Sequence, residues 1–257
     1  MRTATLSAAT LIGLSLATGV YAGLHMDKGL PAYIVAAVGD GARPDADRQR
    51  DAERKPGETL AFAGVKPGDQ VVELAPGGGY YTRLLSAVVG PKGKVYAITS
   101  PPKPDAPPGA PVPGAAVRAI AADPHYANVT VSVQRVAELT LPDKVDLVWT
   151  TQNYHDFHNI PNVDIATVNR AVAGVLKPGG TYFVLDHAAE AGSGARDTDT
   201  LHRIDKATVI KEVEAANFKL AAESSLLANK DDPHTAKVFD PGIRGHTDQF
   251  ALKFRKR

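Results

Sequence analysis

Apolar and polar positions follow two alternating patterns from about residue 58 to the C-terminus. Short runs rich in Val, Ile and Leu predict buried strands, and the longer stretches between them have the spacing of amphipathic helices. Strand alternating with helix predicts an α/β protein with a doubly wound, mostly parallel sheet of seven strands. The expected strands are 70–74, 94–99, 129–133, 145–150, 181–186, 219–227 and 249–254, and the expected helices are 81–89, 163–176 and 206–216.

Two segments depart from this alternation. Residues 100–113 contain seven prolines, which predict a stiff loop after the second strand, because proline fits neither a helix interior nor a central strand. Residues 42–57 are dense in charged side chains, and we expect them to form a solvated helix face with i,i+4 ion pairs.

The connections of the expected sheet are unequal in length. Those at one edge, such as 90–93 and 177–180, are short, whereas those that follow the strand ends are long and polar. Open parallel sheets bind their ligands outside the carboxyl ends of the strands. We therefore expect the long connections to border one crevice that holds a small molecule. These connections are 100–114, 151–160, 187–205 and 228–246.

Composition narrows the class of protein. The 257 residues are 44% hydrophobic, which suits one large α/β domain. The 29 basic and 28 acidic residues nearly balance and no basic run occurs, so we expect a small-molecule substrate and no nucleic acid partner. The chain has no cysteine, which excludes disulfides, thiolate metal sites and cysteine nucleophiles.

The N-terminus has the pattern of an export signal. Arg2 precedes an uncharged run that ends near Leu24, and Val20-Tyr21-Ala22 carries the small residues that a signal peptidase prefers at positions −3 and −1. We predict a signal peptide over 1–22, an N-terminal extension over 23–57 and the main domain over 58–257. The protein would then be periplasmic or secreted. The alternative is an uncleaved anchor, since the uncharged run is about long enough to span a bilayer; otherwise we expect no stable membrane association.

Two motifs a hundred residues apart carry most of the functional information. Residues 71–80 read as an apolar strand ending in an acid, a glycine-rich turn and the start of a helix, a pattern that brings backbone N–H groups close to a ligand. Residues 176–183 read as a helix end, the turn Lys177-Pro178-Gly179-Gly180 and another strand. In this order the two motifs resemble class I S-adenosylmethionine-dependent methyltransferases, over residues 58–255. The resemblance implies a Rossmann-like methyltransferase fold whose last strand is antiparallel, and S-adenosylmethionine as cofactor.

The resemblance also identifies the residues expected at the cofactor. In the family, the second strand ends in an acid that binds the ribose hydroxyls, but this sequence has Thr99 at that position. The family often has another acid near the adenine, and this sequence has Val136 at the matching position. Each absence would weaken binding by about tenfold to a hundredfold, unless Glu138 or Asp105 substitutes. The cofactor residues implied are Glu73, Ala75, Gly77, Gly79, Thr99, Glu138 and Asn153.

The segment after the fourth strand is dense in polar side chains, and the resemblance implies that it faces the transferred methyl group. We predict that His155 acts as general base there, because the pKa of histidine is near neutral pH, and that Asp156 or Tyr154 orients it. The alternative is a polar loop whose histidines only cap the backbone. His187, His202, Asp205 and Arg244 are the expected substrate contacts.

A metal site is a further possibility that the spacing does not specify. Oxygen and nitrogen ligands are available after the fourth and fifth strands, and some catechol-type methyltransferases use a divalent cation. Most such clusters are hydrogen-bonded loops, so we predict no metal. The residues considered are Asp156, His158, Asp186, His187 and Asp205.

Three functions remain open. The first is methyl transfer to a small acceptor that the sequence does not identify. The second is an exported binding protein that has lost catalysis, favoured by Thr99, by Val136 and by the cytoplasmic origin of S-adenosylmethionine. The third, a nicotinamide dehydrogenase, needs Gly-x-Gly-x-x-Gly, but Thr82 stands at the third glycine position.

Overall fold

A seven-stranded sheet forms the centre of the computed structural model, which describes residues 29–103, 105–107 and 109–257. The strand order is β3-β2-β1-β4-β5-β7-β6, and only β7 runs antiparallel to its neighbours. The predicted α/β fold with an antiparallel last strand is therefore confirmed. The strands are β1 (Gln70–Leu74), β2 (Lys94–Thr99), β3 (Val129–Val133), β4 (Val145–Thr151), β5 (Leu176–His187), β6 (Phe218–Ser224) and β7 (Gln249–Lys256).

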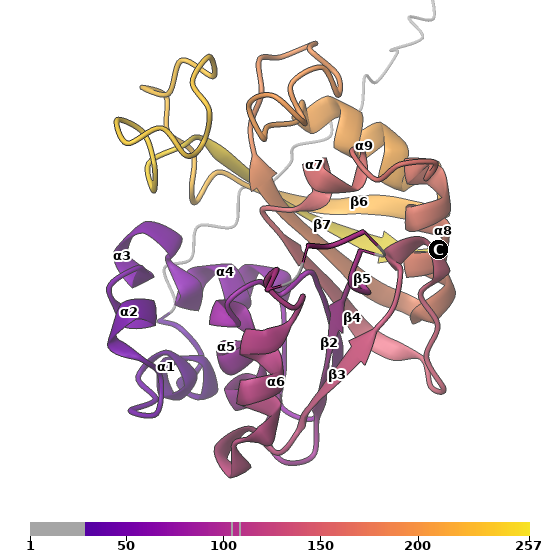
Figure 1. Cartoon of the computed structure of the whole chain (residues 1–257). Helices are drawn as coiled ribbons and strands as arrows, with labels where there is room; N and C mark the ends of the chain where they lie inside the picture. Colours follow the sequence, from indigo (N-terminus) through magenta and orange to yellow (C-terminus); the bar gives the residue numbers. More distant parts are fainter. Residues whose placement is uncertain (1–28, 104, 108) are drawn as a thin grey trace, which may run out of the picture.

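Helices cover both faces of the sheet (Figure 1). The N-terminal helices lie with α5 and α6 on one side, and α7, α8 and α9 lie on the other. The helices are α1 (Ala32–Val38), α2 (Asp45–Arg48), α3 (Asp51–Arg54), α4 (Pro56–Ala63), α5 (Tyr80–Val89), α6 (Ala115–Ala122), α7 (Tyr154–Phe157), α8 (Ile165–Val175) and α9 (Lys206–Glu214), with short 3-10 turns η1 (Pro124–Tyr126) and η2 (Val136–Glu138).

The core has two layers because successive strand side chains point to opposite faces. Along β4, Trp149 is buried in the layer beneath α5, whereas Val148 is buried in the layer beneath α8 and α9. The Trp149 ring packs 4.8 Å from Tyr81 and 4.3 Å from Phe183, between ring centroids. The apolar runs that predicted strands are thus buried on both sides, as expected of a parallel sheet covered by helices.

Several predicted boundaries needed correction. The helix 163–176 ends at Val175, because Leu176 already pairs with Val145 of β4. The strand 219–227 ends at Ser224, where its pairing with Ala251 of β7 stops. The strand 181–186 is part of the longer β5, which begins at Leu176 and includes the residues of the predicted turn 177–180. The helices α6 and α7 were not predicted.

Most charged side chains of the segment 42–57 are exposed, as predicted, but the segment does not form the single helix that was expected. Its helices α2 and α3 are four residues each, and the Arg43 side chain, only 1% exposed, holds Asp51 through two hydrogen bonds of 2.9 and 2.6 Å. Asp47 pairs with Arg83 of α5 at 2.9 Å. The ion pairs therefore join this segment to the domain. The predicted boundary between 57 and 58 falls inside α4, whose buried Leu60 belongs to the core beneath α5.

The N-terminal predictions concern residues outside the described range. The signal peptide over 1–22, the cleavage site after Ala22 and the alternative anchor all fall within residues 1–28. In the described part of the chain, no helix is long and apolar enough to cross a membrane.

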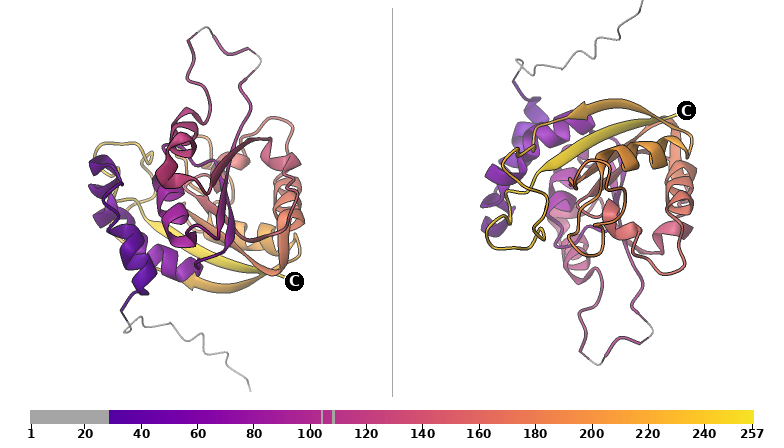
Figure 2. Two further views of the ribbon diagram at one scale, coloured as in Figure 1. Left: turned by 90° about the horizontal axis from the view of Figure 1, so that it is seen from below. Right: turned by 90° about the horizontal axis from the view of Figure 1, so that it is seen from above.

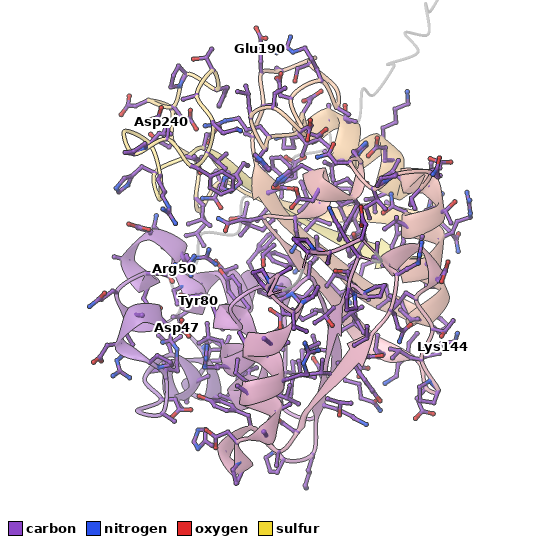
Figure 3. The ribbon with its side chains drawn as sticks, viewed as in Figure 1. Asp47, Arg50, Tyr80, Lys144, Glu190 and Asp240 are labelled. Atoms are coloured by element: carbon purple, nitrogen blue, oxygen red, sulfur yellow. The ribbon has the colours of Figure 1, made fainter. Side chains whose placement is uncertain are left out.

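The long connections gather at one end of the molecule, as predicted. Glu190 and Asp240, from the loops after β5 and β6, lie at one end and Lys144, just before β4, at the other (Figure 3). The proline-rich segment leaves the domain body after β2 and returns to α6 (Figure 2). The expectation of a single crevice needed correction, because only two of the four connections line the cavity described next. The other two are joined to each other by the buried ion pair of Arg203 with Asp232.

Candidate cofactor and acceptor site

A cavity of about 710 Å³ opens beyond the carboxyl ends of β1, β2 and β3. This is where an open parallel sheet places its ligand. The walls come from the turn after β1, the proline-rich segment, the segment after β3 and the segment after β4. The lining residues include Leu74–Gly77, Ile98–Lys103, Pro113, Gly114, Gln134–Glu138, Asp156, Phe157 and Ile160–Val163.

The glycine turn after β1 has a left-handed backbone at three places: Ala75 (φ 48°), Gly77 (φ 56°) and Gly79 (φ 80°). Gly77 lines the cavity, and no atom lies within 4 Å of the place that a Cβ would occupy, so a ligand can approach its backbone. Gly79 was predicted to bind the cofactor but has another role. A Cβ there would lie 2.1 Å from Cδ1 of Ile120, so this glycine lets α6 pack against the turn.

Glu73 also points away from the cavity, contrary to prediction. Its side chain is 2% exposed and accepts a 2.6 Å hydrogen bond from the Thr82 hydroxyl of α5. Burial raises the pKa of Glu73 to about 8, although this hydrogen bond opposes the shift. The motif acid is therefore part of the packing between β1 and α5.

Asn153 supports the turn and does not line the cavity. Its Nδ2 donates hydrogen bonds to the carbonyl oxygens of Leu74, at 3.2 Å, and Ala75, at 3.1 Å. These bonds join the end of β4 to the glycine turn, so Asn153 fixes the shape of the wall.

Thr99 and Glu138 are two of the predicted cofactor residues that lie at the cavity. Both line the cavity, and the buried Thr99 hydroxyl has no hydrogen-bond partner among the described residues. An unsatisfied buried hydroxyl is costly unless a ligand completes it. The Thr99 hydroxyl could form a hydrogen bond with the ribose of S-adenosylmethionine, and the open space at Gly77 would admit the rest of the cofactor. The residues present therefore fit the cofactor that the resemblance implies.

Arg54 was missed because its segment was interpreted as solvated. Its guanidinium lies 4.8 Å from the Tyr80 ring centroid and donates a 2.8 Å hydrogen bond to Oε1 of Gln152, which follows β4. Burial lowers the pKa of Arg54 below its ordinary value. In the part of the chain that the structure describes, no carboxylate forms an ion pair with it. A half-buried cation without a counter-ion, beside the glycine turn, is suited to an anionic ligand group. The neighbouring Arg50 also lies against Tyr80, as the labelled side chains show (Figure 3).

His155, the predicted general base, is buried between two carboxylates. It is 2% exposed, and its Nδ1 and backbone N–H each lie 2.8 Å from a carboxylate oxygen of Asp186. Its Nε2 lies 3.3 Å from Oδ1 of Asp156. Burial lowers the pKa of His155, but the charge of Asp186 and the hydrogen bonds to both carboxylates outweigh it and raise the pKa to about 10. An imidazole that keeps its proton at neutral pH donates hydrogen bonds to both carboxylates, so in this arrangement His155 positions Asp156, and its role as general base stays a prediction.

The two residues predicted to orient His155 lie on different sides of α7. Asp156 is 51% exposed and lines the cavity, so it is the member of this group that reaches a bound ligand. Tyr154 is fully buried away from it, donating to Glu212 at 3.0 Å and accepting from Asn169 at 2.8 Å. Tyr154 therefore anchors α7 and does not orient His155.

Of the four predicted substrate contacts, only His202 lies near Asp156 at the cavity. Its Nδ1 is 3.6 Å from Oδ1 of Asp156. His187 is buried 2.7 Å from the Thr247 hydroxyl, and burial lowers its pKa to about 4 against the opposing effect of Asp186. Asp205 caps α9, accepting from the backbone N–H of Ala207 at 3.2 Å. Arg244 is exposed in the loop 228–246.

The residues considered as metal ligands do not form one site. His158 lies 3.1 Å from Glu212 and Asp205 caps a helix, so neither joins Asp156. The structure instead brings His155 and His202 together with Asp156.

Comparison with known proteins supports the fold. No protein-family model matches the sequence, and neither does any curated protein. A SAM-dependent methyltransferase from Aquifex aeolicus superposes with a TM-score of 0.57 at 19% identity, covering 84% of this chain and 99% of that one. The CcbJ methyltransferase from Streptomyces caelestis gives 0.55 at 15% identity, over 85% and 100%. The [4+2]-cyclase SpnF gives 0.57 at 18% identity, over 84% of each chain. The protein therefore has the fold of class I S-adenosylmethionine-dependent methyltransferases.

Proposed function

We propose that the protein is an S-adenosylmethionine-dependent methyltransferase that acts on a small molecule and not on nucleic acid. The observation that carries this proposal is the cavity beyond β1 and β2, where an open glycine backbone and an orphan hydroxyl meet. The fold alone would not suffice, because one fold supports many functions.

Each part of the cofactor has a counterpart in the cavity wall. Gly77 and Ala75 offer their backbone to the amino-acid end, and Thr99 offers its hydroxyl to the ribose. Glu138 is the carboxylate available to the nucleoside. Arg54 does not line the cavity, but it lies 4.8 Å from the ring of Tyr80, the residue that follows the glycine turn, and would supply positive charge for the cofactor's carboxylate. When bound, S-adenosylmethionine supplies an electrophilic methyl group.

Catalysis would rest mainly on positioning the acceptor. Asp156 is the titratable side chain of α7 at the cavity, so we assign to it the contact with the acceptor's proton. His155 holds Asp156 in place through Nε2 and is itself fixed by Asp186. The role predicted for His155 thus passes to its neighbour.

The second candidate is a protein of this fold that does not transfer methyl groups. It is favoured by the absence of a carboxylate at Thr99, which lowers the expected cofactor affinity. The similarity to SpnF, described as a [4+2]-cyclase, shows that the fold is not limited to methyltransferases.

Calorimetry with S-adenosylmethionine and with NAD on the purified protein tests the cofactor on which the methyltransferase proposal depends. We expect binding of S-adenosylmethionine at micromolar affinity or weaker, and none of NAD. Gly77→Val should abolish binding, whereas Gly192→Val, also at a left-handed glycine in open space (φ 81°), should not. Arg54→Gln should weaken binding, and the surface variant Arg48→Gln should not. No binding of S-adenosylmethionine by the wild type would favour the second candidate, and binding of NAD alone would reject the methyltransferase.

We also propose that the protein is exported, on the pattern of residues 2–24. Mass spectrometry of protein from its native host should find a chain that begins at Gly23. Full-length protein in the cytoplasm would reject export and would remove the question of how the cofactor reaches the enzyme.

A further inference from the structure

Three potential metal ligands converge beside the cavity from two separate segments. His155 and Asp156 are consecutive residues of α7, and His202 lies in the loop after β5. One ligand atom of each lies within 4.8 Å of the other two. Oδ1 of Asp156 is 3.3 Å from Nε2 of His155 and 3.6 Å from Nδ1 of His202.

These separations suit a metal ion. Ligands about 2.1 Å from a tetrahedral ion lie about 3.4 Å from one another, close to both measured distances. A rotation of the His202 ring, which is 26% exposed on its side chain, adjusts the third separation. No large movement is needed to place an ion between the three atoms.

The surroundings of His155 are those of a metal-binding histidine. Metal-ligating histidines generally donate their other ring N–H to a carboxylate, which fixes the ring and its tautomer. Asp186, fully buried, occupies this position at 2.8 Å from Nδ1, and it also accepts the backbone N–H of His155. Nε2 is therefore held toward Asp156, and a metal ion bound there would replace the proton on Nε2.

The cluster of His155, Asp156 and His202 is also open to the cavity on one side. Asp156 is 51% exposed and lines the cavity, so an ion bound to it would face the cavity with positions left for other ligands. Three protein ligands with an open position are the pattern of catalytic sites, whereas structural sites are closed.

We propose that His155, Asp156 and His202 bind a divalent transition-metal ion whose open position accepts an oxygen or nitrogen atom of the substrate. Two imidazoles and one carboxylate favour Zn²⁺, Co²⁺ or Fe²⁺ over Mg²⁺ and Ca²⁺, which prefer oxygen ligands alone. The role in substrate binding rests on the proposed methyltransferase function, but metal binding itself does not. The ion would bring a chelating acceptor next to the methyl group.

The test uses the untagged protein as its host produces it, stripped of metal with a chelator. Titration with Co²⁺ should give visible absorption bands from nitrogen and oxygen ligands, and calorimetry with Zn²⁺ should give one site per chain. His202→Ala should weaken both by more than about tenfold. The matched control is His125→Ala, which removes a partly exposed histidine paired with Asp40 outside this group. Circular dichroism would confirm that each variant is folded.

The outcomes separate the two proposals. If His202→Ala and His125→Ala bind Co²⁺ like the wild type, or if the wild type binds none, the metal site is rejected. Binding of S-adenosylmethionine without metal would then leave the proposed function intact. Metal binding lost only in His202→Ala would support the site, even in a protein that bound no S-adenosylmethionine.

Discussion

At the residue scale, Ala75 has a left-handed backbone in the glycine turn although it is not a glycine. It stands where the resembling family has glycine, and its φ is 48°. A left-handed backbone costs an L-residue about 1–2 kcal/mol relative to glycine, and glycine gives back part of this through its greater freedom when unfolded.

Ala75→Gly should therefore raise the free energy of unfolding by about 1 kcal/mol, measured by urea denaturation. The matched control is Ala36→Gly on the exposed side of α1, which should lower it by about 0.5–1 kcal/mol. Equal destabilisation by both variants would show that Ala75 is not strained.

Thr99 stands where the resembling family has an acid that binds the ribose hydroxyls, and a substitution can restore that acid. Thr99→Asp should tighten S-adenosylmethionine binding by about tenfold to a hundredfold, because a charged acceptor strengthens hydrogen bonds from both ribose hydroxyls. Thr99→Asn has the same shape without the charge and should gain much less. Calorimetry measures both. Equal affinities in the two variants would mean that the ribose lies elsewhere.

Glu73 should make stability depend on pH. Its pKa is raised by burial to about 8, so between the unfolded value near 4.5 and about 8 the folded protein holds a proton that the unfolded chain has released. Its contribution to stability is then complete below the unfolded pKa and falls by roughly 1 kcal/mol per pH unit across this window.

Glu73→Gln, which cannot titrate, should remove that slope, and the variant should be the more stable protein at pH 8. Thermal unfolding at several pH values measures the difference from wild type. The same slope in both proteins would contradict the buried, protonated side chain.

At the scale of secondary-structure elements, two loops stabilise each other through a buried ion pair. The loop after β5 and the loop after β6 are joined by Arg203 and Asp232, both fully buried, which make hydrogen bonds of 2.8 and 3.1 Å. Arg203 also donates to the carbonyl oxygens of Ala188 and Ala236. This pair fixes the loop that carries His202.

Asp232→Ala should destabilise the protein by about 3–5 kcal/mol, because it leaves the Arg203 charge buried without a partner. Asp45→Ala, which breaks an exposed pair with Arg48, should cost less than about 1 kcal/mol. Chemical denaturation compares the two. A small loss in Asp232→Ala would mean that water reaches Arg203.

At the scale of the whole molecule, the N-terminal helices belong to the main domain. Ile34 of α1 is fully buried in the core layer that also holds Leu84 and Leu85 of α5. The segment 42–57 adds the ion pairs of Arg43 and Asp47 to this contact.

A fragment of residues 58–257 should therefore unfold at a lower temperature than residues 29–257, or aggregate, because it exposes the apolar face of α5. Thermal melting by circular dichroism and gel filtration measure both properties. Equal melting temperatures would support a separate domain that begins at residue 58.

The sequence by itself determined the strands of the sheet, the class of fold and the end of the molecule that carries the site. These follow from local patterns: apolar runs specify buried strands, and the left-handed backbone at Gly77 follows from the residue type. For the same reason β1, β2 and β3 were predicted with their observed bounds.

Only the tertiary structure decided which way the site residues point and what they contact. Glu73 and Gly79 belong to the motif, yet one packs under α5 and the other against α6. Nothing in the sequence around His155 indicates that Asp186, on the neighbouring strand β5, holds its ring. The pKa of a side chain, its exposure and its ligand partners depend on distances between segments far apart in the chain, and residue type does not set those distances.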